Sequence, residues 1–200
     1  MDDQFGRILE AVDRAGIEEE TIVIFTSDHG EMMGSHGSMG KAVFWDESFR
    51  VPFMIRWPNQ LKARHEELLI GTPDIMPTVL GLMGLGESIP ESVEGQNYVA
   101  AIQDQPDAVR PEFAWYYNAW NGRGLRTKDT ACYFERGDRT GSNDYLFDMP
   151  NDPCQLENQA RARPKQVKEF ARETRHWMAG LNDKFIAYPS GQKLLDALPG

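Results

Sequence analysis

The chain has 200 residues, of which 40% are hydrophobic and 26% charged, and its formal net charge is −10 at pH 7. This length suits one or two domains with a real hydrophobic core, and no apolar run approaches the length of a membrane span. The acidic charge argues against a nucleic-acid backbone as the partner, because that partner needs a basic patch. The N-terminal residues, MDDQF, show no signal-peptide pattern.

An amphipathic helix is predicted over residues 3–14. Four apolar side chains recur at the spacing of one helical face, namely Phe5, Ile8, Leu9 and Val12. Gly16 follows the last of them and is a favourable helix stop. We expect this helix to pack through its apolar face and to lead into a strand.

The apolar run at residues 22–25 predicts a strand buried on both faces, because it is rich in β-branched residues and turn signals follow it. In open parallel sheets, ligands lie beyond the carboxyl ends of the strands, which is where Asp28 and His29 stand. Gly30 lets the chain leave the pleat, so that both side chains can face one ion. The pair is therefore a candidate metal site. A capping Asp beside a surface His is the alternative interpretation.

A glycine-rich loop follows and ends at Lys41. Its glycines allow close approach of the backbone to a ligand; they are Gly30, Gly34, Gly37 and Gly40. The ammonium of Lys41 is suited to an oxyanion, although a solvated surface lysine fits the same pattern. His36 lies five residues earlier. A second apolar run at 51–58 predicts another strand, with Pro58 as its stop.

The stretch from Thr21 to Trp57 resembles the sulfatase family of the alkaline phosphatase superfamily. The matching pieces are the strand ending in TSDHGE, the Gly- and His-rich loop, the dipeptide Gly-Lys at 40–41 and the lead-in Arg-Val-Pro at 50–52. The resemblance implies that Asp28 and His29 are the family's second pair of divalent-metal ligands. It also implies that Lys41 contacts the sulfate of the substrate.

The same resemblance places His36 in the catalytic loop, where its role differs among family members, so Lys41 and His36 are the candidate catalytic residues. Many sulfatases carry Asn where His29 stands. A His at this position is also similar to the phosphonate and phosphate ester hydrolases of the superfamily, which leaves the metal and the ester class open.

Sulfatases use a formylglycine nucleophile made from Cys or Ser in a [Cys/Ser]-x-Pro-Ser-Arg motif, together with an early Asp-Asp metal pair. Neither feature occurs in this sequence, because residues 2–3 open a helix and residues 189–191 read Pro-Ser-Gly. Only two convincing strands are visible in the first hundred residues, and a parallel sheet of two strands has two exposed edges. We therefore expect a C-terminal portion of a larger protein, without turnover by itself.

Residues 61–111 are predicted to contain two helices between loops. A polar loop covers 61–67, and a helix over 73–84 carries Ile75, Val79, Leu82 and Met83 as a core stripe, with Thr72 or Asp74 as its cap. A short helical piece follows at 98–102. The polar segment 103–111 contains two prolines and is a candidate linker.

Short strands separated by turns predict a small antiparallel sheet in the C-terminal half. They lie at residues 112–117, 124–128, 131–134 and 144–148, and a final helix is expected over 164–185. The aromatic side chains of Trp115, Tyr116, Tyr117 and Trp120 either pack this sheet or line a substrate cleft. Cys132 and Cys154 are too few for a disulfide framework, and we expect two free thiols.

The predicted fold class is α/β, the C-terminal part of an alkaline-phosphatase-like parallel or mixed sheet with flanking helices, plus the small antiparallel sheet. The expected division is a catalytic part at 1–105, a subdomain at 112–188 and a tail at 189–200. The expected function is that of a sulfuric ester hydrolase acting on a sulfated small molecule or glycan. The expected partner is the N-terminal remainder of the catalytic domain, and we expect binding to neither nucleic acid nor membrane. A phosphonate or phosphodiester hydrolase and a non-catalytic carbohydrate-binding module are the alternatives.

The expected cofactor is one divalent metal ion. Carboxylates favour Ca²⁺ or Mg²⁺, while an imidazole ligand favours Mn²⁺ or Zn²⁺. The resemblance to sulfatases implies Ca²⁺.

Overall fold

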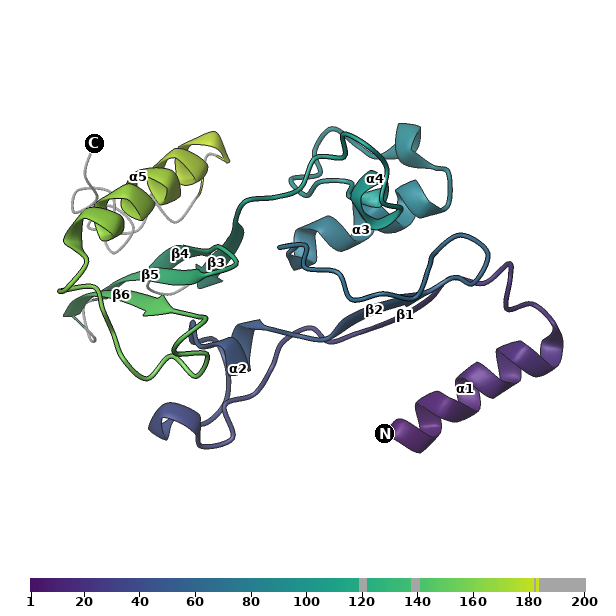
Figure 1. Cartoon of the computed structure of the whole chain (residues 1–200), viewed down its shortest axis with the longest axis horizontal. Helices are drawn as coiled ribbons and strands as arrows, with labels where there is room; N and C mark the ends of the chain where they lie inside the picture. The colour runs from purple at the N-terminus through teal and green to yellow at the C-terminus, as the bar shows by residue number, and fades with distance from the viewer. Residues whose placement is uncertain (119–121, 138–140, 182, 184–200) are drawn as a thin grey trace.

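The computed structural model describes residues 1–118, 122–137, 141–181 and 183. It contains two separate sheets, one of two strands and one of four (Figure 1). Helix α1 lies at one end of the molecule, and the four-stranded sheet with helix α5 lies at the other (Figure 1). None of the helices in the described ranges is long and apolar enough to cross a membrane.

The predicted helix–strand order at the N-terminus is confirmed. Helix α1 spans Asp2–Ala15 and ends at Gly16, which has a left-handed φ of 65° and donates its N–H to Asp13 and Val12. Strand β1 (Val23–Thr26) pairs with β2 (Phe53–Arg56) in antiparallel register. The two strands are thus not parallel to each other, and β1 is only half-buried rather than covered on both faces.

The apolar face of α1 does not pack as the sequence predicted. No residue of this helix is buried, and the side chain of Ile8 is 57% exposed. The ring of Phe5 contacts the ring of Phe25 in β1, with centroids 4.9 Å apart. Periodicity identified the helix correctly, but it carries no information about what covers an apolar face.

Two of the helices that precede the C-terminal sheet lie near their predicted positions. Helix α3 spans Thr72–Leu82, and α4 spans Val99–Ile102. Two short 3₁₀ turns also lie before the C-terminal sheet, η1 (Ser35–Gly37) and η2 (Gly86–Ser88). The carboxylate of Asp74 accepts the N–H of Gly71 at 2.8 Å and so caps α3. Of the predicted core stripe, Leu82 is buried but Met83 is 56% exposed.

The small antiparallel sheet is confirmed. Its strands follow in sequence order, β3 (Ala114–Asn118), β4 (Gly122–Arg126), β5 (Thr130–Gly137) and β6 (Gly141–Asp148). Helix α5 (Pro164–Gly180) covers one face, and the segment around the short helix α2 (Asp46–Phe49) covers the other (Figure 1).

Alternation along the strands divides the core of this sheet into two clusters. Cys132 and Phe134 of β5 face the cluster that includes Phe170 and Met178 of α5. Their neighbours Ala131 and Tyr133 face the cluster on the α2 side. The two sides of one strand therefore bind two segments that are far apart in the sequence.

Two of the four aromatic residues that were expected either to pack the sheet or to line a cleft do pack the sheet. Trp115 stacks on Trp177 of α5 with ring centroids 4.5 Å apart, and Tyr116 is 4% exposed. Tyr117 is 55% exposed and lies under the guanidinium of Arg123 at 4.0 Å. Trp120 lies outside the described residues, as do the predicted tail and the predicted end of the last helix at 185. Both cysteines are free, as expected.

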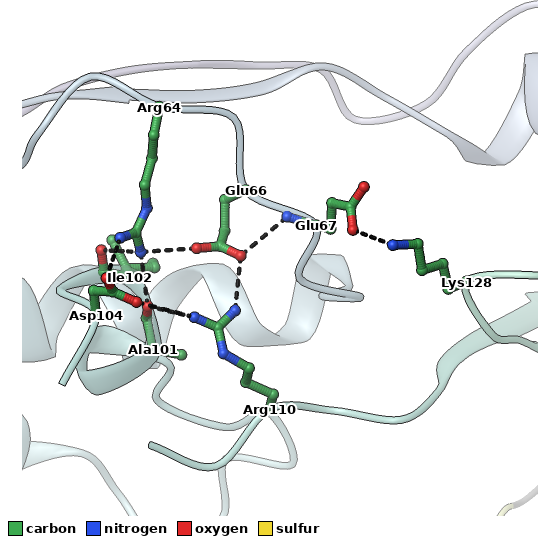
Figure 2. A network of polar contacts seen from close by, with 8 residues as sticks. All are labelled: Arg64, Glu66, Glu67, Ala101, Ile102, Asp104, Arg110 and Lys128. Atoms are coloured by element: carbon green, nitrogen blue, oxygen red, sulfur yellow. Dashed lines mark hydrogen bonds and ion pairs between the residues drawn. The ribbon is translucent and has the colours of Figure 1, made fainter. Parts of the chain in front are cut away.

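A polar network connects the loop before α3 to the segment after α4 (Figure 2). The carboxylate of Glu66 binds Arg64 and Arg110, each at 2.8 Å, and both arginines also pair with Asp104. Next to it, Glu67 binds Lys128, which follows β4. Apart from the Arg64–Glu66 pair, these ion pairs join segments that are distant in the sequence.

Candidate active site

The residues at the end of β1 form a compact turn around Asp28 and His29. The Ser27 hydroxyl donates to the His29 carbonyl at 2.8 Å, and the His29 N–H donates to Asp28 Oδ1 at 3.0 Å. These local bonds hold the turn that follows the strand. The expected use of glycine's backbone freedom at Gly30 is not observed, because Gly30 is not among the residues with positive φ. The Asp28 side chain is 82% exposed and that of His29 is 37% exposed, so both are accessible from solvent.

The two side chains lie side by side. His29 Nε2 is 3.3 Å from Asp28 Oδ2, while His29 Nδ1 is 2.7 Å from the carbonyl oxygen of Gly30. A carbonyl can only accept, so Nδ1 carries a proton and Nε2 is the nitrogen that faces the carboxylate. Metal-binding histidines characteristically donate their second N–H to such an oxygen.

This geometry fits a divalent ion. Nitrogen and oxygen ligands bind such ions at roughly 2.0–2.6 Å, so two donors on one ion are about 3–3.5 Å apart. Nε2 of His29 and Oδ2 of Asp28 have this separation. The described residues contain no group of three or more His, Cys, Asp or Glu side chains suited to a metal, so the pair would supply two ligands of a larger shell.

Local bonds also favour the charged form of Asp28. Desolvation acts to raise its pKa, but the hydrogen bonds from the N–H of His29 and from the Ser27 hydroxyl lower the pKa below its ordinary value of 3.8, and the imidazole of His29 lowers it further when it is protonated. A carboxylate that stays ionised is the form that binds a cation.

The loop after the Asp28–His29 pair is closed by a backbone hydrogen bond. Met32 donates its N–H to the carbonyl of Gly40 at 2.8 Å, which closes the loop just before Lys41. The backbone of Lys41 is therefore adjacent to a residue only four positions after Asp28. Its side chain is exposed and open to an anionic ligand.

His36 has a different environment from the Asp28–His29 pair. Its backbone has a φ of 52°, and its imidazole stacks on Trp45 with centroids 3.9 Å apart and planes 4° apart. Its Nε2 lies 3.6 Å from Glu47 Oε1, and its side chain is only 11% exposed. These contacts fix the ring against the segment that leads into and forms α2.

Gly30 makes the second connection to α2. Its N–H donates to the carbonyl of Ser48 at 2.8 Å, and a Cβ on it would lie 1.9 Å from the carbonyl oxygen of Glu47. Only glycine fits this close approach. Asp46, at the start of α2, donates its N–H to the side chain of Gln155. The sequence analysis did not single out either residue, because no local pattern marks a contact between residues 109 positions apart.

Comparison with known proteins identifies the family of the chain. The family model described as Sulfatase matches residues 1–85, the part that carries the Asp28–His29 pair and Lys41. An endo-4-O-sulfatase from Bacteroides thetaiotaomicron is 39% identical over 188 residues, which cover 84% of this chain and 37% of the relative. The chain belongs to the sulfatase family. Sulfatases generally use a divalent metal ion and a formylglycine nucleophile.

Solved structures confirm the alkaline-phosphatase-like α/β fold class of this sulfatase chain. One, from work on the metabolism of multiple glycosaminoglycans by Bacteroides thetaiotaomicron, is 34% identical with a TM-score of 0.84, and covers 100% of this chain and 44% of that one. The phosphonate monoester hydrolase of Agrobacterium radiobacter is 26% identical with a TM-score of 0.78, over 94% and 40%. The chain thus spans less than half the length of each of these relatives.

Proposed function

We propose that this sulfatase chain supplies two metal ligands and a substrate-binding lysine to the active site of a sulfuric ester hydrolase. The observation that carries the proposal is the 3.3 Å approach of His29 Nε2 to Asp28 Oδ2, with Nδ1 bound to the Gly30 carbonyl. A bound divalent ion would neutralise the negative charge on the ester oxygens and would lower the pKa of the nucleophile. Ca²⁺ is our first candidate, with Mn²⁺, Mg²⁺ and Zn²⁺ as alternatives.

The side chains of this chain have separate tasks in the proposal. Asp28 and His29 bind the ion, and their local hydrogen bonds orient the two ligand side chains. Lys41 binds one anionic oxygen of the ester, which requires an exposed ammonium close to the metal pair. The contacts of His36 with Trp45 and Glu47 support a role in positioning the loop, and its direct participation in catalysis stays a prediction.

The proposed substrate class is a sulfated glycan or a related small sulfate ester. The relatives that support it are the named endo-4-O-sulfatase and the structure from work on glycosaminoglycan metabolism. Both relatives are longer than this chain, so we propose that further catalytic-domain residues complete the site. The nucleophile is among them, because the sequence contains no [Cys/Ser]-x-Pro-Ser-Arg motif.

Binding of Mn²⁺ to the purified chain tests the metal site directly. Mn²⁺ broadens the NMR signals of nearby rings, and the chain has four histidines, of which His65 and His176 are exposed. We expect selective broadening of His29, competed by Ca²⁺ and abolished by Asp28→Ala. Asp129→Ala, which removes an exposed carboxylate elsewhere, is the control. Equal broadening of His65 and His176 would contradict the proposal.

Binding of an aryl sulfate tests the role of Lys41. In the presence of Ca²⁺, we expect Lys41→Met to weaken binding by about tenfold, because it removes a charge-assisted hydrogen bond. Lys62→Met removes another exposed ammonium and is the control. Unchanged affinity in Lys41→Met would remove this residue from the proposal.

A phosphonate or phosphodiester hydrolase is the second candidate function. The imidazole at position 29 and the similarity to the Agrobacterium radiobacter phosphonate monoester hydrolase support it. Assays of a protein that contains this chain together with a nucleophile motif, with an aryl sulfate, a phosphonate monoester and a phosphodiester side by side, distinguish the two. Dominant hydrolysis of the phosphonate would replace the sulfatase assignment.

The non-catalytic alternative depends on aromatic side chains that bind a carbohydrate. Trp115 and Tyr116 do not form such a surface, because they are engaged with α5 and α2. Glycan binding that survives both Asp28→Ala and chelation would nevertheless favour this alternative.

A further inference from the structure

The candidate site depends on a helix too short to be stable by itself. Helix α2 has four residues, Asp46–Phe49, and an isolated helix of this length does not persist in water. Yet both parts of the site contact it. Gly30 binds the carbonyl of Ser48, and the ring of His36 lies on Trp45 at its N-terminus.

The C-terminal sheet stabilises α2 from the opposite side. Oε1 of Gln155 accepts the backbone N–H of Asp46 at 2.9 Å. The Asp46 carboxylate accepts bonds from the Tyr116 hydroxyl at 3.2 Å and from Arg126 at 3.3 Å. Ring contacts add to these bonds: Phe44 with Tyr133, Trp45 with Phe147 and Phe49 with Tyr116.

Gln155 itself is fixed by the turn after β6. It is 1% exposed, has a φ of 55° and donates its N–H to the carbonyl of Asp152. The Asp152 carboxylate accepts the N–H groups of Leu156 and Glu157 at 3.0 and 2.8 Å, which fixes the turn on both sides of Gln155. The turn at 151–153, which reads Asn-Asp-Pro, therefore holds Gln155 in place.

We propose that Gln155 and Asp46 are positioning residues for the metal pair, acting through α2 and Gly30. This inference rests on the proposed function for the identity of the site. The path runs from the Asp152 turn to Gln155, then to the backbone of Asp46, then to Ser48 and Gly30, and so to His29. Every step is a hydrogen bond or a peptide segment of the described structure.

The variant Gln155→Met isolates this path. Methionine has nearly the same length and keeps the buried volume, but it cannot accept the N–H of Asp46. The Gln155 amide nitrogen has no hydrogen-bond partner within the described residues, so the change removes no other bond. Gln166→Ala is the control, because Gln166 also bonds to the sheet, through Thr130, but belongs to α5, which covers the face opposite α2.

Two measurements on the full chain decide the proposal. In Gln155→Met we expect the Gly30 amide to exchange about tenfold faster with solvent, with no change at Phe134 in the core of the sheet. We expect the apparent Mn²⁺ affinity, read from broadening of His29, to fall about tenfold, as for other partners of metal ligands. Gln166→Ala should change neither.

The outcomes separate the two proposals. Unchanged Gly30 exchange in Gln155→Met would overturn the positioning role, whatever the metal does. Faster exchange at Gly30 and Phe134 alike would also overturn it, since the effect would then be global. If Mn²⁺ does not broaden His29 in the unmodified chain, the metal site fails, while the exchange at Gly30 still decides the coupling. Asp46→Asn is a second variant, expected to act in the same direction.

Discussion

Arg110 Nη1 lies 2.8 Å from Glu66 Oε1, a contact that ties the segment after α4 to the loop before α3. Arg64 binds the other carboxylate oxygen at 2.8 Å, so Glu66 lies between two guanidinium groups (Figure 2). Desolvation acts to raise the pKa of Glu66. The bonds from Arg110 and from the N–H of Glu67, with the charges of both arginines, lower it below the ordinary 4.5.

This shift predicts a pH-dependent contribution to stability. Because the folded-state pKa lies below the unfolded one, the contribution is fully present well above pH 4.5 and is lost as the pH falls through the folded pKa. Glu66→Gln should therefore lower the free energy of unfolding by about 1 kcal/mol at pH 7 and by much less in acid. Urea unfolding at both pH values measures the difference.

The neighbouring residue is the control for this prediction. Glu67 pairs with Lys128, but both side chains are largely exposed, at 73% and 68%. Glu67→Gln should therefore change stability very little at either pH. A loss in Glu66→Gln that is the same at neutral and acidic pH would show that its charge is not the cause.

Gly30 and Gly6 predict opposite effects of the same substitution. In Gly30→Ala, the new Cβ would meet the Glu47 carbonyl, so we expect a loss of at least about 2 kcal/mol. Gly6 lies inside α1, and a Cβ added there would have no neighbouring atom within 4 Å, so Gly6→Ala should stabilise the helix by about 0.5–1 kcal/mol. Thermal unfolding followed by circular dichroism measures both. Equal tolerance of the two changes would contradict the close approach at Gly30.

Much of the fold was predictable because its signals are local. The period of α1, the β-branched run of β1 and the alternation in β5 each lie within a few residues. The Asp28–His29 pair stood out as a candidate for the same reason, since the strand, the two proposed ligands and the glycine are consecutive. Lys41 followed from the loop glycines and from the resemblance to sulfatases.

What the sequence did not reveal depends on partners that are distant in the chain. No local sequence pattern marks the bond between Gln155 and Asp46. The sequence also could not show whether His36 packs on Trp45 or is exposed to solvent. The apolar stripe of α1 predicted a helix, but it did not predict that Ile8 stays exposed. A parallel or mixed sheet was expected here, whereas β1 pairs with β2 in antiparallel register, because periodicity does not encode strand direction. The boundary between residues 105 and 112 stays a prediction.

The stacked pair Trp115 and Trp177 predicts how α5 is attached to the sheet. The rings lie 4.5 Å apart and almost parallel, at the edge of the cluster under α5. Trp177→Ala should cost about 2–3 kcal/mol, less than a fully buried tryptophan, because both rings are only partly buried. It should also remove the near-ultraviolet circular dichroism of the stacked indoles. Arg172→Ala, on the exposed face of α5, should change stability by less than about 0.5 kcal/mol.

The two cysteines predict a clear difference in reactivity. Burial, with a smaller contribution from the charge of Asp144, raises the pKa of the Cys132 thiol, whereas Cys154 is exposed. The thiolate is the reactive form, so a thiol reagent at neutral pH should label Cys154 quickly and Cys132 only after unfolding in guanidinium chloride. Mass spectrometry of the labelled chain counts the modified thiols, and Cys154→Ser should abolish labelling of the folded protein. Rapid labelling of Cys132 in the folded chain would show that the core between β5 and α5 opens far more readily than its packing implies.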